Sequence, residues 1–471
     1  MLIYILLFLF VAMLVLSYRV FNREIVNPSV IFCFMYTLSI LSAIYNISAW
    51  NIDLVWKTFF ILFLGGVEFI LISYIIKKKF EKKYADIEEN KKKDTVNFVL
   101  NKYIMILLSV FSIVVIGILV FNIYKIASQF GAYNNFTEAQ RLFKSHTSYS
   151  NDASLPSYLP RLLKILELSS YICLYSFLYN VINSSEKKLS RIILKNIYYI
   201  VPVIFYIASE FISSSRITTI QLGCAGIVMG LIIWHSKYEW KKHIEFKFIG
   251  KMILIGVVCL VAFYYSAALI GRENSKGMLD YITLYAGGSI ECLNQYVKEP
   301  ITQSQTKGSE TFILLMRGLN KYGVTHFNLL DSQTPHLEFR YYNDNMIGNV
   351  YTAYRRWYND FGVIGIAVLN GFMAFVFNTL YYLFKYRRLK KYNHLVMIIF
   401  GYISYAIFLH PVDSYFYTTV FQITFGTNLI LFTILYILFF VIKYDKENKK
   451  INFGNTPILS LNKYIKGNVK G

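Results

Sequence analysis

The sequence predicts an all-α polytopic membrane protein with about eleven transmembrane helices. Of its 471 residues, 56% are hydrophobic and only 16% are charged, whereas soluble domains usually carry about 25% charged residues. The mean hydropathy is +0.44, and apolar runs of about 18 to 25 residues, long enough to cross a bilayer, recur along the chain. These observations exclude a disordered chain, a collagen, a coiled coil and a secreted disulfide scaffold.

The predicted spans follow one another along the whole chain. They cover about residues 2–18, 28–47, 55–76, 103–124, 160–182, 196–213, 217–235, 252–269, 361–384, 394–409 and 415–442. The predicted architecture is therefore a helical bundle whose spans are joined by loops and turns.

Basic segments alternate with segments poor in Lys and Arg, and this alternation predicts the orientation of the chain. The basic segments are residues 77–102, 187–195, 237–251, 385–391 and the tail 443–471. Loops rich in Lys and Arg stay in the cytoplasm, so an odd number of spans with a basic end predicts an outer N-terminus and a cytoplasmic C-terminus. No basic residue precedes the first span, so we expect it to remain as an anchor and not to be removed as a signal peptide.

The net charge of +21 belongs entirely to the predicted cytoplasmic side. The cytoplasmic segments hold 32 of the 48 Lys and Arg residues and 11 of the 27 Asp and Glu residues, while the rest of the chain holds 16 of each. The positive charge thus marks the orientation of the chain and the contact with anionic lipids. Nucleic-acid binding is not expected.

Two predicted outer segments are long enough to carry a function. They are the first outer loop at residues 125–159 and the large outer loop at residues 270–360. Within the large loop, residues 278–297 and 309–322 have the pattern of short amphipathic helices, which we expect at the membrane interface. The whole chain is expected to form one integral membrane domain, with residues 443–471 as a cytoplasmic tail.

The sequence contains no motif that would hold a metal or a common cofactor. It lacks a P-loop, a zinc-binding His-Glu-x-x-His, a Gly-x-Ser-x-Gly elbow and a dinucleotide fingerprint. Four of the five cysteines fall within predicted spans, which leaves Cys292 as the only outer thiol. We therefore expect no disulfide, no metal site and no cofactor.

Arginine is concentrated on the predicted outer side. It accounts for 8 of the 16 cations there but for only 5 of the 32 in the cytoplasmic segments. A guanidinium is a planar fork that can bind phosphate or carboxylate through two hydrogen bonds, which lysine cannot do. The eight candidates are Arg141, Arg161, Arg216, Arg272, Arg317, Arg340, Arg355 and Arg356.

Arg216 is the strongest of these candidates. It ends a Ser-Ser-Ser-Arg turn at residues 213–216, between two predicted spans. Hydroxyl groups and the free N–H groups of the following helix suit an anion at the membrane surface. The alternative is an arginine that snorkels at a helix end beside serines that only break the helix. Glu210, within the preceding span, is placed to orient Arg216 through neighbouring groups.

A second group, Arg272 and Glu273, follows the eighth predicted span directly. It is interpreted either as an anion ligand beside a base or as a surface ion pair of small energetic value. The sequence assigns no firm role to two further features. Glu68 lies within a span, and the turn His410-Pro-Val-Asp413 either borders the site or only breaks a helix.

Residues 336–362 form the third group and resemble a sugar-binding surface. Aromatic rings can stack on sugar faces, while amides, acids and guanidinium groups bind hydroxyls. The candidates for substrate binding, together with Arg317, are Tyr341, Tyr342, Asn349, Tyr351, Arg355, Arg356 and Trp357; the candidates for catalysis are His336, Arg340 and Asp360. The alternative is an interfacial aromatic belt with anchoring charges. His336 is interpreted either as a base or as an ordinary surface histidine.

Several of these segments resemble bacterial oligosaccharide repeat-unit polymerases, the Wzy-type O-antigen and capsule polymerases. The resemblance is carried by the Ser-Ser-Ser-Arg turn, by Tyr-Ala-Gly-Gly-Ser-Ile at residues 285–290, by Asn-Val-Tyr-Thr at residues 349–352, and by Asp-Phe-Gly at residues 360–362 with Gly365. The order of spans and the late large loop agree with this family. The pattern of Arg, ten residues and Gly that occurs in some members is absent from the outer arginines.

The resemblance implies a GT-C-like membrane protein that transfers a growing glycan from its polyprenyl diphosphate carrier to the next lipid-linked repeat unit. Arg216, with Arg272 or Arg340, would stabilise the diphosphate leaving group without a metal. His336, Glu273 or Asp360 would act as the base. The implied location is the bacterial cytoplasmic membrane with an outward-facing site, and the implied partners are a chain-length regulator and a flippase.

Two alternatives remain open at this point. A ligase that moves finished glycan to a different acceptor would need the same spans and arginines. A flippase for lipid-linked oligosaccharide belongs to a different class, and it is less favoured because the sequence shows no repeated halves and few charges within spans.

Overall fold

The computed structural model describes residues 1–84, 100, 102–149, 152–269, 277–299, 306–327, 337–387, 393–440, 442–445 and 450–453. Within these residues the chain is mainly helical, and nine helices are long and apolar enough to cross a membrane. The predicted class, an all-α multi-pass membrane protein, is confirmed.

The first half of the chain supplies ten helical segments. They are α1 (Leu2–Val20), α2 (Pro28–Tyr45), α3 (Trp56–Tyr84), α4 (Lys102–Phe130), α5 (Phe136–Lys144), the π-helical turn Ser145–Tyr149, α6 (Tyr158–Asn183), α7 (Leu189–Asn196), the 3₁₀ turn Ile197–Tyr199 and α8 (Ile200–Ile212). Local sequence explains where several begin. Pro28 occupies the first turn of α2, and the Asn27 side chain accepts a hydrogen bond from the Ser29 amide at 3.0 Å, which is an ordinary N-cap.

The second half supplies the remaining helices and two small hairpins. They are α9 (Ile217–Lys237), α10 (Phe246–Leu269), α11 (Met278–Lys298), α12 (Ile313–Lys321), β1 (Arg340–Tyr342), β2 (Asn345–Gly348), α13 (Tyr354–Arg387), α14 (Asn393–Phe408), α15 (Tyr415–Val420), α16 (Ile423–Phe440), β3 (Ile442–Asp445) and β4 (Lys450–Phe453). Strands β1 and β2 pair antiparallel, as do β3 and β4.

The structure differs from the predicted elements in three places. The last predicted span is divided, because the helix stops at Val420 and restarts at Ile423. The helix expected at residues 309–322 starts only at Ile313, since a turn with Gly308 at φ +84° precedes it. Neither hairpin was predicted, because strands of three or four residues leave too short a pattern to detect.

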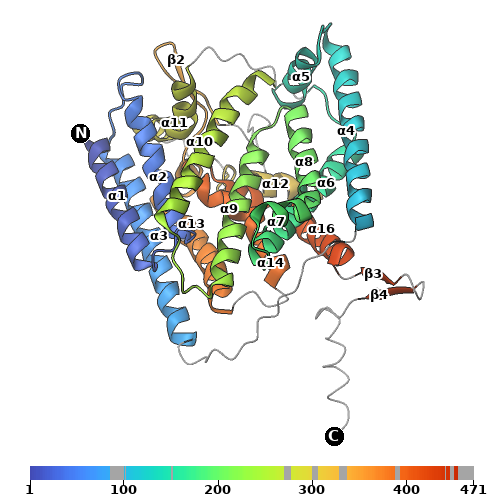
Figure 1. The fold of residues 1–471 in the computed structure, drawn as a ribbon. Coiled ribbons are helices and arrows are strands. Elements are labelled where there is room, and N and C mark those ends of the chain that lie inside the picture. Colours follow the sequence, from blue (N-terminus) through green and yellow to red (C-terminus); the bar gives the residue numbers. More distant parts are fainter. Residues whose placement is uncertain are drawn as a thin grey trace.

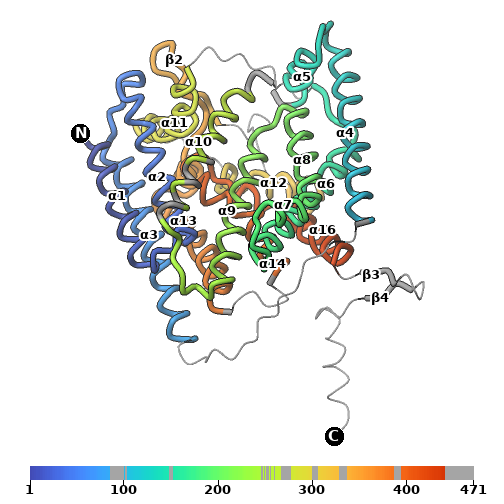
Figure 2. Tube along the Cα trace, in the orientation of Figure 1, coloured from blue at the N-terminus to red at the C-terminus, as the bar shows by residue number. Residues whose placement is uncertain are grey.

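The helices run back and forth between two ends of the bundle (Figure 1, Figure 2). We call them the hairpin end, which carries α5, α11 and the β1–β2 hairpin, and the tail end, which carries β3 and β4. At the tail end, Lys385 of α13 pairs with the buried Glu24 after α1. Inside the bundle, the Ala353 amide donates to the His410 carbonyl at 3.0 Å, and the His410 ring contacts Phe32 and Tyr36 of α2. Both predicted outer loops therefore lie at the same end.

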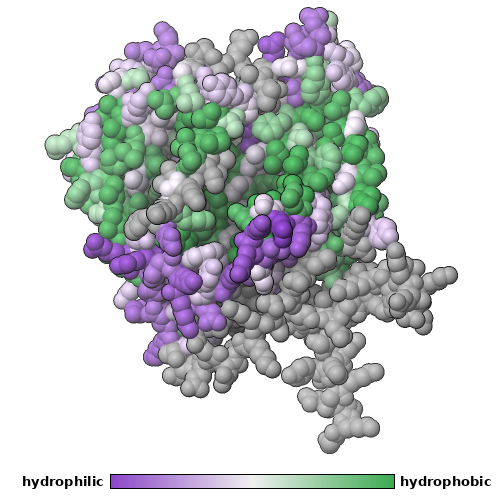
Figure 3. Space-filling model, in the orientation of Figure 1, coloured by the Kyte–Doolittle hydropathy of each residue, from purple (hydrophilic) through white to green (hydrophobic). Residues whose placement is uncertain are grey.

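The surface has the polarity expected of a membrane protein. Apolar side chains form a broad belt around the helices, and hydrophilic side chains gather at both ends (Figure 3). Helices α3 and α13 pack closely inside the bundle and are joined by polar contacts: Asn370 donates to the Glu68 carboxylate at 2.8 Å, and Ser73 donates to Asn378 at 2.5 Å. Glu68, which the sequence left without a role, thus has a partner across a helix interface.

Candidate functional site

Two clusters of predicted site residues lie at the hairpin end. The first, which we call the Arg216 site, consists of Arg216 and the rings of Phe263, Tyr264, Tyr281 and Tyr285. The second, the Arg355 network, links three arginines to three carboxylates of the large loop and to one of the turn at residues 410–413. Its members are Glu299, Glu310, Glu338, Arg340, Arg355, Arg356 and Asp413.

The turn that carries Arg216 is held on both sides. Gln140 of α5 donates to the last two carbonyls of α8, those of Phe211 and Ile212, at 3.0 and 2.9 Å. The Glu210 carboxylate accepts a hydrogen bond from the Thr218 hydroxyl at 2.6 Å, which ties the end of α8 to the start of α9. Glu210 thus holds the turn that carries Arg216, and its role in orienting the guanidinium stays a prediction.

Arg216 is a buried cation, only 7% exposed. Its guanidinium donates to the Tyr281 hydroxyl at 2.7 Å and to the Phe263 carbonyl at 3.2 Å, and it lies 4.3 Å from the centre of the Phe263 ring. No carboxylate of the described residues forms an ion pair with it. Because an uncompensated buried charge is costly, this environment favours binding of an anion.

Aromatic rings surround this guanidinium from α10 and α11. The ring of Tyr281 lies 5.6 Å from that of Tyr264 and 5.1 Å from that of Tyr285, and Phe263 contacts Tyr285 edge to face. Tyr265, beside them on α10, is 66% exposed. Such rings lower the polarity around the charge and offer flat faces for a sugar.

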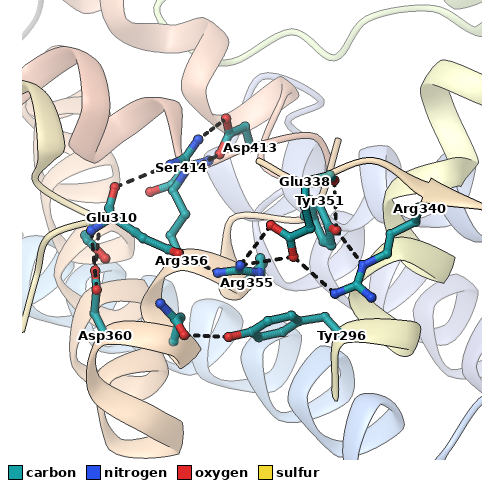
Figure 4. A network of polar contacts seen from close by, with 12 residues as sticks. Tyr296, Glu310, Glu338, Arg340, Tyr351, Arg355, Arg356, Asp360, Asp413 and Ser414 are labelled. Carbon is teal, nitrogen blue, oxygen red and sulfur yellow. Dashed lines mark hydrogen bonds and ion pairs between the residues drawn. The ribbon is translucent and has the colours of Figure 1, made fainter. Parts of the chain in front are cut away.

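The Arg355 network has its centre at the start of α13 (Figure 4). Arg355, 4% exposed, pairs with Glu310 and donates to both oxygens of Glu338 at 3.2 Å. Its guanidinium also lies over the Tyr296 ring, 3.7 Å from the ring centre. Burial raises the pKa of Glu310 although Arg355 opposes this effect. Partial burial acts to raise the pKa of Glu338, but Arg355 and Arg340 hold it below its usual range.

Arg340 and Arg356 extend the network in two directions. Arg340, on the β1–β2 hairpin, pairs with Glu299 at the end of α11 and donates to the Tyr351 hydroxyl at 2.8 Å. Arg356 forms a bidentate pair with Asp413, at 2.7 and 3.1 Å. The turn at residues 410–413 therefore anchors the start of α13, and it does not merely break a helix.

These contacts give a structural role to three of the predicted site arginines, the catalytic candidate Arg340 and the substrate-binding candidates Arg355 and Arg356. Arg340, Arg355 and Arg356 are each matched by a carboxylate, so in this arrangement they hold the large loop together. Asp360 is 2% exposed and accepts hydrogen bonds from the amides of Glu310 and Thr311, at 3.3 and 2.7 Å. Its carboxylate is engaged by the main chain, which does not favour a role as a base.

The other predicted residues are dispersed. Trp357 and Tyr351 are completely buried, and the Trp357 indole donates to Ser414 at 2.8 Å. Tyr341 is 54% exposed on the hairpin, next to the partly buried Tyr342. Asn349 follows the hairpin and Arg317 lies on α12. Arg272, Glu273 and His336 lie outside the described residues.

Helix α11 separates the two clusters. Tyr281 near its start contacts Arg216, and Tyr296 near its end contacts Arg355 and Arg340. The two tyrosines are separated by fifteen positions along the chain, which corresponds to about 22 Å of helix. Arg216 and Arg340 therefore do not share one anion in this arrangement, although the sequence grouped them.

Sequence reasoning did not identify the carboxylates Glu299, Glu310, Glu338 and Asp413 as partners of the arginines. One signal was present: the large loop at residues 270–360 contains nine Asp and Glu residues and nine Lys and Arg residues, and this balance indicates mutual pairing. No family model, no characterised protein and no solved structure matches this chain.

Proposed function

We propose that the protein is a membrane glycosyltransferase that polymerises polyprenyl-diphosphate-linked repeat units into a surface polysaccharide, an O-antigen or capsule. It would act on the outer face of the bacterial cytoplasmic membrane. The observation that carries the proposal is Arg216, a buried guanidinium with no carboxylate partner among the described residues, set in an aromatic cluster at the end of the bundle.

The proposed reaction places developing negative charge where this guanidinium lies. The acceptor hydroxyl oxygen forms a bond to the anomeric carbon of the donor sugar, and the bond from that carbon to the diphosphate oxygen breaks. The electron pair leaves with the diphosphate, and the hydroxyl proton passes to a base, for which Glu273 and His336 are the proposed candidates. Arg216 stabilises the leaving group by two charge-assisted hydrogen bonds, which needs no metal.

The orientation of the chain supports the proposed side of action. The basic segments predicted to be cytoplasmic include residues 237–251, which follow α9, and Lys385, which pairs with Glu24 at the tail end. The Arg216 site lies at the opposite, hairpin end. With the predicted orientation, this arrangement supports an outward-facing site, as the proposed reaction requires.

The direct test is polymerisation by the purified protein in lipid nanodiscs. We expect a ladder of products from a lipid-linked repeat unit, and a loss of about a hundredfold or more in rate for Arg216→Ala, as for other groups that stabilise an oxyanion. Arg161→Ala, which removes an exposed arginine at the same end, is the matched control and keeps the wild-type rate.

Three outcomes would contradict the proposal. An undiminished ladder from Arg216→Ala removes the central assignment. Transfer of finished glycan to a different acceptor, without a ladder, identifies a ligase. Passage of lipid-linked oligosaccharide across a vesicle bilayer without transfer identifies a flippase. For the orientation, a cysteine at the exposed Lys307 is expected to react with an impermeant reagent from outside only.

A further inference from the structure

Helices α6 and α8 pack side by side and hold a polar cluster between them inside the bundle (Figure 1). The Ser170 hydroxyl of α6 donates to the Pro202 carbonyl of α8 at 3.0 Å, which aligns the two helices. Because the helices run in opposite directions, the residues before Ser170 lie level with those after Pro202. We call the polar group at that level the Glu167 cluster, and its members are Lys164, Glu167, Tyr206, Glu210 and Tyr402.

The Glu167 cluster contains two carboxylates and one cation. Glu167 is 9% exposed, and its side chain pairs with Lys164, which lies one turn before it on α6. Glu210 is partly buried, accepts the hydrogen bond of Thr218 described above, and interacts electrostatically with the other two charged groups. No other cation of the described residues forms an ion pair with either carboxylate. One positive and two negative charges leave the ionised cluster with one uncompensated negative charge, which is costly inside the bundle.

A buried hydroxyl without a partner lies near both carboxylates. Tyr206 is 2% exposed, and its hydroxyl has no hydrogen-bond partner in the part of the chain that the structure describes. This hydroxyl interacts electrostatically with both Glu167 and Glu210, so it points into the space beside them. Tyr402 of α14, 6% exposed, interacts with the Glu167 carboxylate. Buried polar atoms almost always have a partner, so the free hydroxyl indicates that a further species belongs between the two acids.

The chemistry of the cluster suits a small monovalent cation. Carboxylate and hydroxyl oxygens are ligands that hard cations prefer, and a single positive charge balances the uncompensated negative charge. A proton on one carboxylate would balance it too, but it would leave the Tyr206 hydroxyl without a partner. A multivalent metal is not favoured, because the described residues contain no group of three or more His, Cys, Asp or Glu side chains that could hold one.

We propose that the Glu167 cluster binds one monovalent cation, which is held by the carboxylates of Glu167 and Glu210 and by the Tyr206 hydroxyl. The sequence shows no motif for such a site, because the two carboxylates lie on different helices. Since Glu210 also holds Thr218 in the first turn of α9, the bound cation stabilises the turn that carries Arg216. This site goes beyond the proposed function, and binding of a cation there requires no glycan substrate.

The test is equilibrium binding of radioactive sodium ion to the full-length protein in nanodiscs, with potassium as a competitor. We expect saturable binding of one ion per chain. Glu210→Gln should weaken this binding about a hundredfold, because a charged ligand is lost from a buried site. Tyr206→Phe should weaken it about tenfold, because one neutral ligand is lost. Lys164→Gln should instead strengthen it about tenfold, since a competing positive charge is removed. Glu245→Gln, which removes an exposed carboxylate before α10, is the matched control and keeps the wild-type affinity.

A second measurement covers variants that fold poorly. The wild type is expected to unfold at a higher temperature in sodium chloride than in N-methylglucamine chloride of equal ionic strength, because a ligand of the folded state stabilises that state. Glu210→Gln is expected to unfold at the same temperature in both salts. Tyr206→Phe replaces it if it does not fold, because that change removes a single oxygen atom.

Several outcomes overturn the site. They are the lack of saturable sodium binding by the wild type, and wild-type affinity in both Glu210→Gln and Tyr206→Phe. A wild-type stability that changes with pH but is equal in the two salts shows that a proton occupies the cluster. Displacement of sodium by traces of calcium shows a divalent site, whereas competition by potassium supports a monovalent one. Cation binding that persists while no glycan ladder forms refutes the proposed function alone.

Discussion

Removal of the Arg355 guanidinium is expected to open the large loop locally. Arg355 is 4% exposed and pairs with Glu310, whose side chain is 19% exposed. Removing one partner of a buried ion pair leaves the other charge uncompensated, which costs about 3–5 kcal/mol. The ion pair of Arg355 with Glu338 adds little to this free energy, because the Glu338 side chain is 43% exposed. We therefore expect Arg355→Gln to lower the free energy of local opening by about 3 kcal/mol.

Cys292 reports this opening. It is fully buried on α11, and its thiol lies 3.6 Å from the Gly348 carbonyl at the end of the β1–β2 hairpin. In a variant whose other four cysteines are replaced by alanine, reaction of Cys292 with a thiol-reactive fluorophore requires the hairpin to move away. If the loop opens and closes faster than Cys292 reacts, a decrease of about 3 kcal/mol in the free energy of opening raises the labelling rate on the order of a hundredfold.

Two controls test the reasoning. The double variant Glu310→Gln/Arg355→Gln removes both charges, so it is expected to recover most of the protection. Arg340→Gln breaks a pair with the 52% exposed Glu299, so its labelling rate is expected to rise only about fivefold or less. Labelling of Arg355→Gln at the wild-type rate, with the hairpin still in place, would refute the assignment of Arg355 as the central tie of the loop.

Two further predictions concern helix α11. Burial raises the pKa of Glu291 from 4.5 to about 7. The stability that its protonation contributes to the folded state, about 3 kcal/mol, is therefore lost as the pH rises from 4.5 to about 7. Thermal unfolding measured against pH should show this loss in the wild type and in the exposed control Glu245→Gln, but not in Glu291→Gln. A Cβ atom at Gly287 would lie 2.4 Å from the Ala43 amide nitrogen. We therefore expect Gly287→Ala to lower the free energy of unfolding in denaturant by about 2 kcal/mol, whereas Gly117→Ala, in open space, should not lower it. Equal stability of the two variants would contradict the close approach of α11 to α2.

The features of the fold that depend on local sequence were predicted correctly. Apolar runs of span length are enough to predict a multi-pass helical membrane protein, because lipid leaves the backbone no other way to satisfy its hydrogen bonds. The amphipathic segment at residues 278–297 corresponds to α11 for a similar reason. The division between α15 and α16 was missed, since both sides of the break are equally apolar.

The candidate site was predicted less completely. Arg216 was singled out from the Ser-Ser-Ser-Arg turn, and its burial without a carboxylate partner in the described residues agrees with that choice. Arg355 and Arg356 were expected to bind substrate and Arg340 to take part in catalysis, yet all three pair with carboxylates. Composition shows that a segment is rich in charges, but it does not show which charges neutralise one another.

The sequence by itself determined the class of the protein and the positions of most of its long apolar helices. These properties depend on short stretches of chain and on their average polarity. The tertiary structure decided which cations are paired and which remain available. Arg355 meets a carboxylate 45 residues away and Arg356 meets one 57 residues away, whereas Arg216 meets aromatic rings of α10 and α11. Such partners are chosen by the packing of helices distant in sequence, and no local pattern encodes that choice.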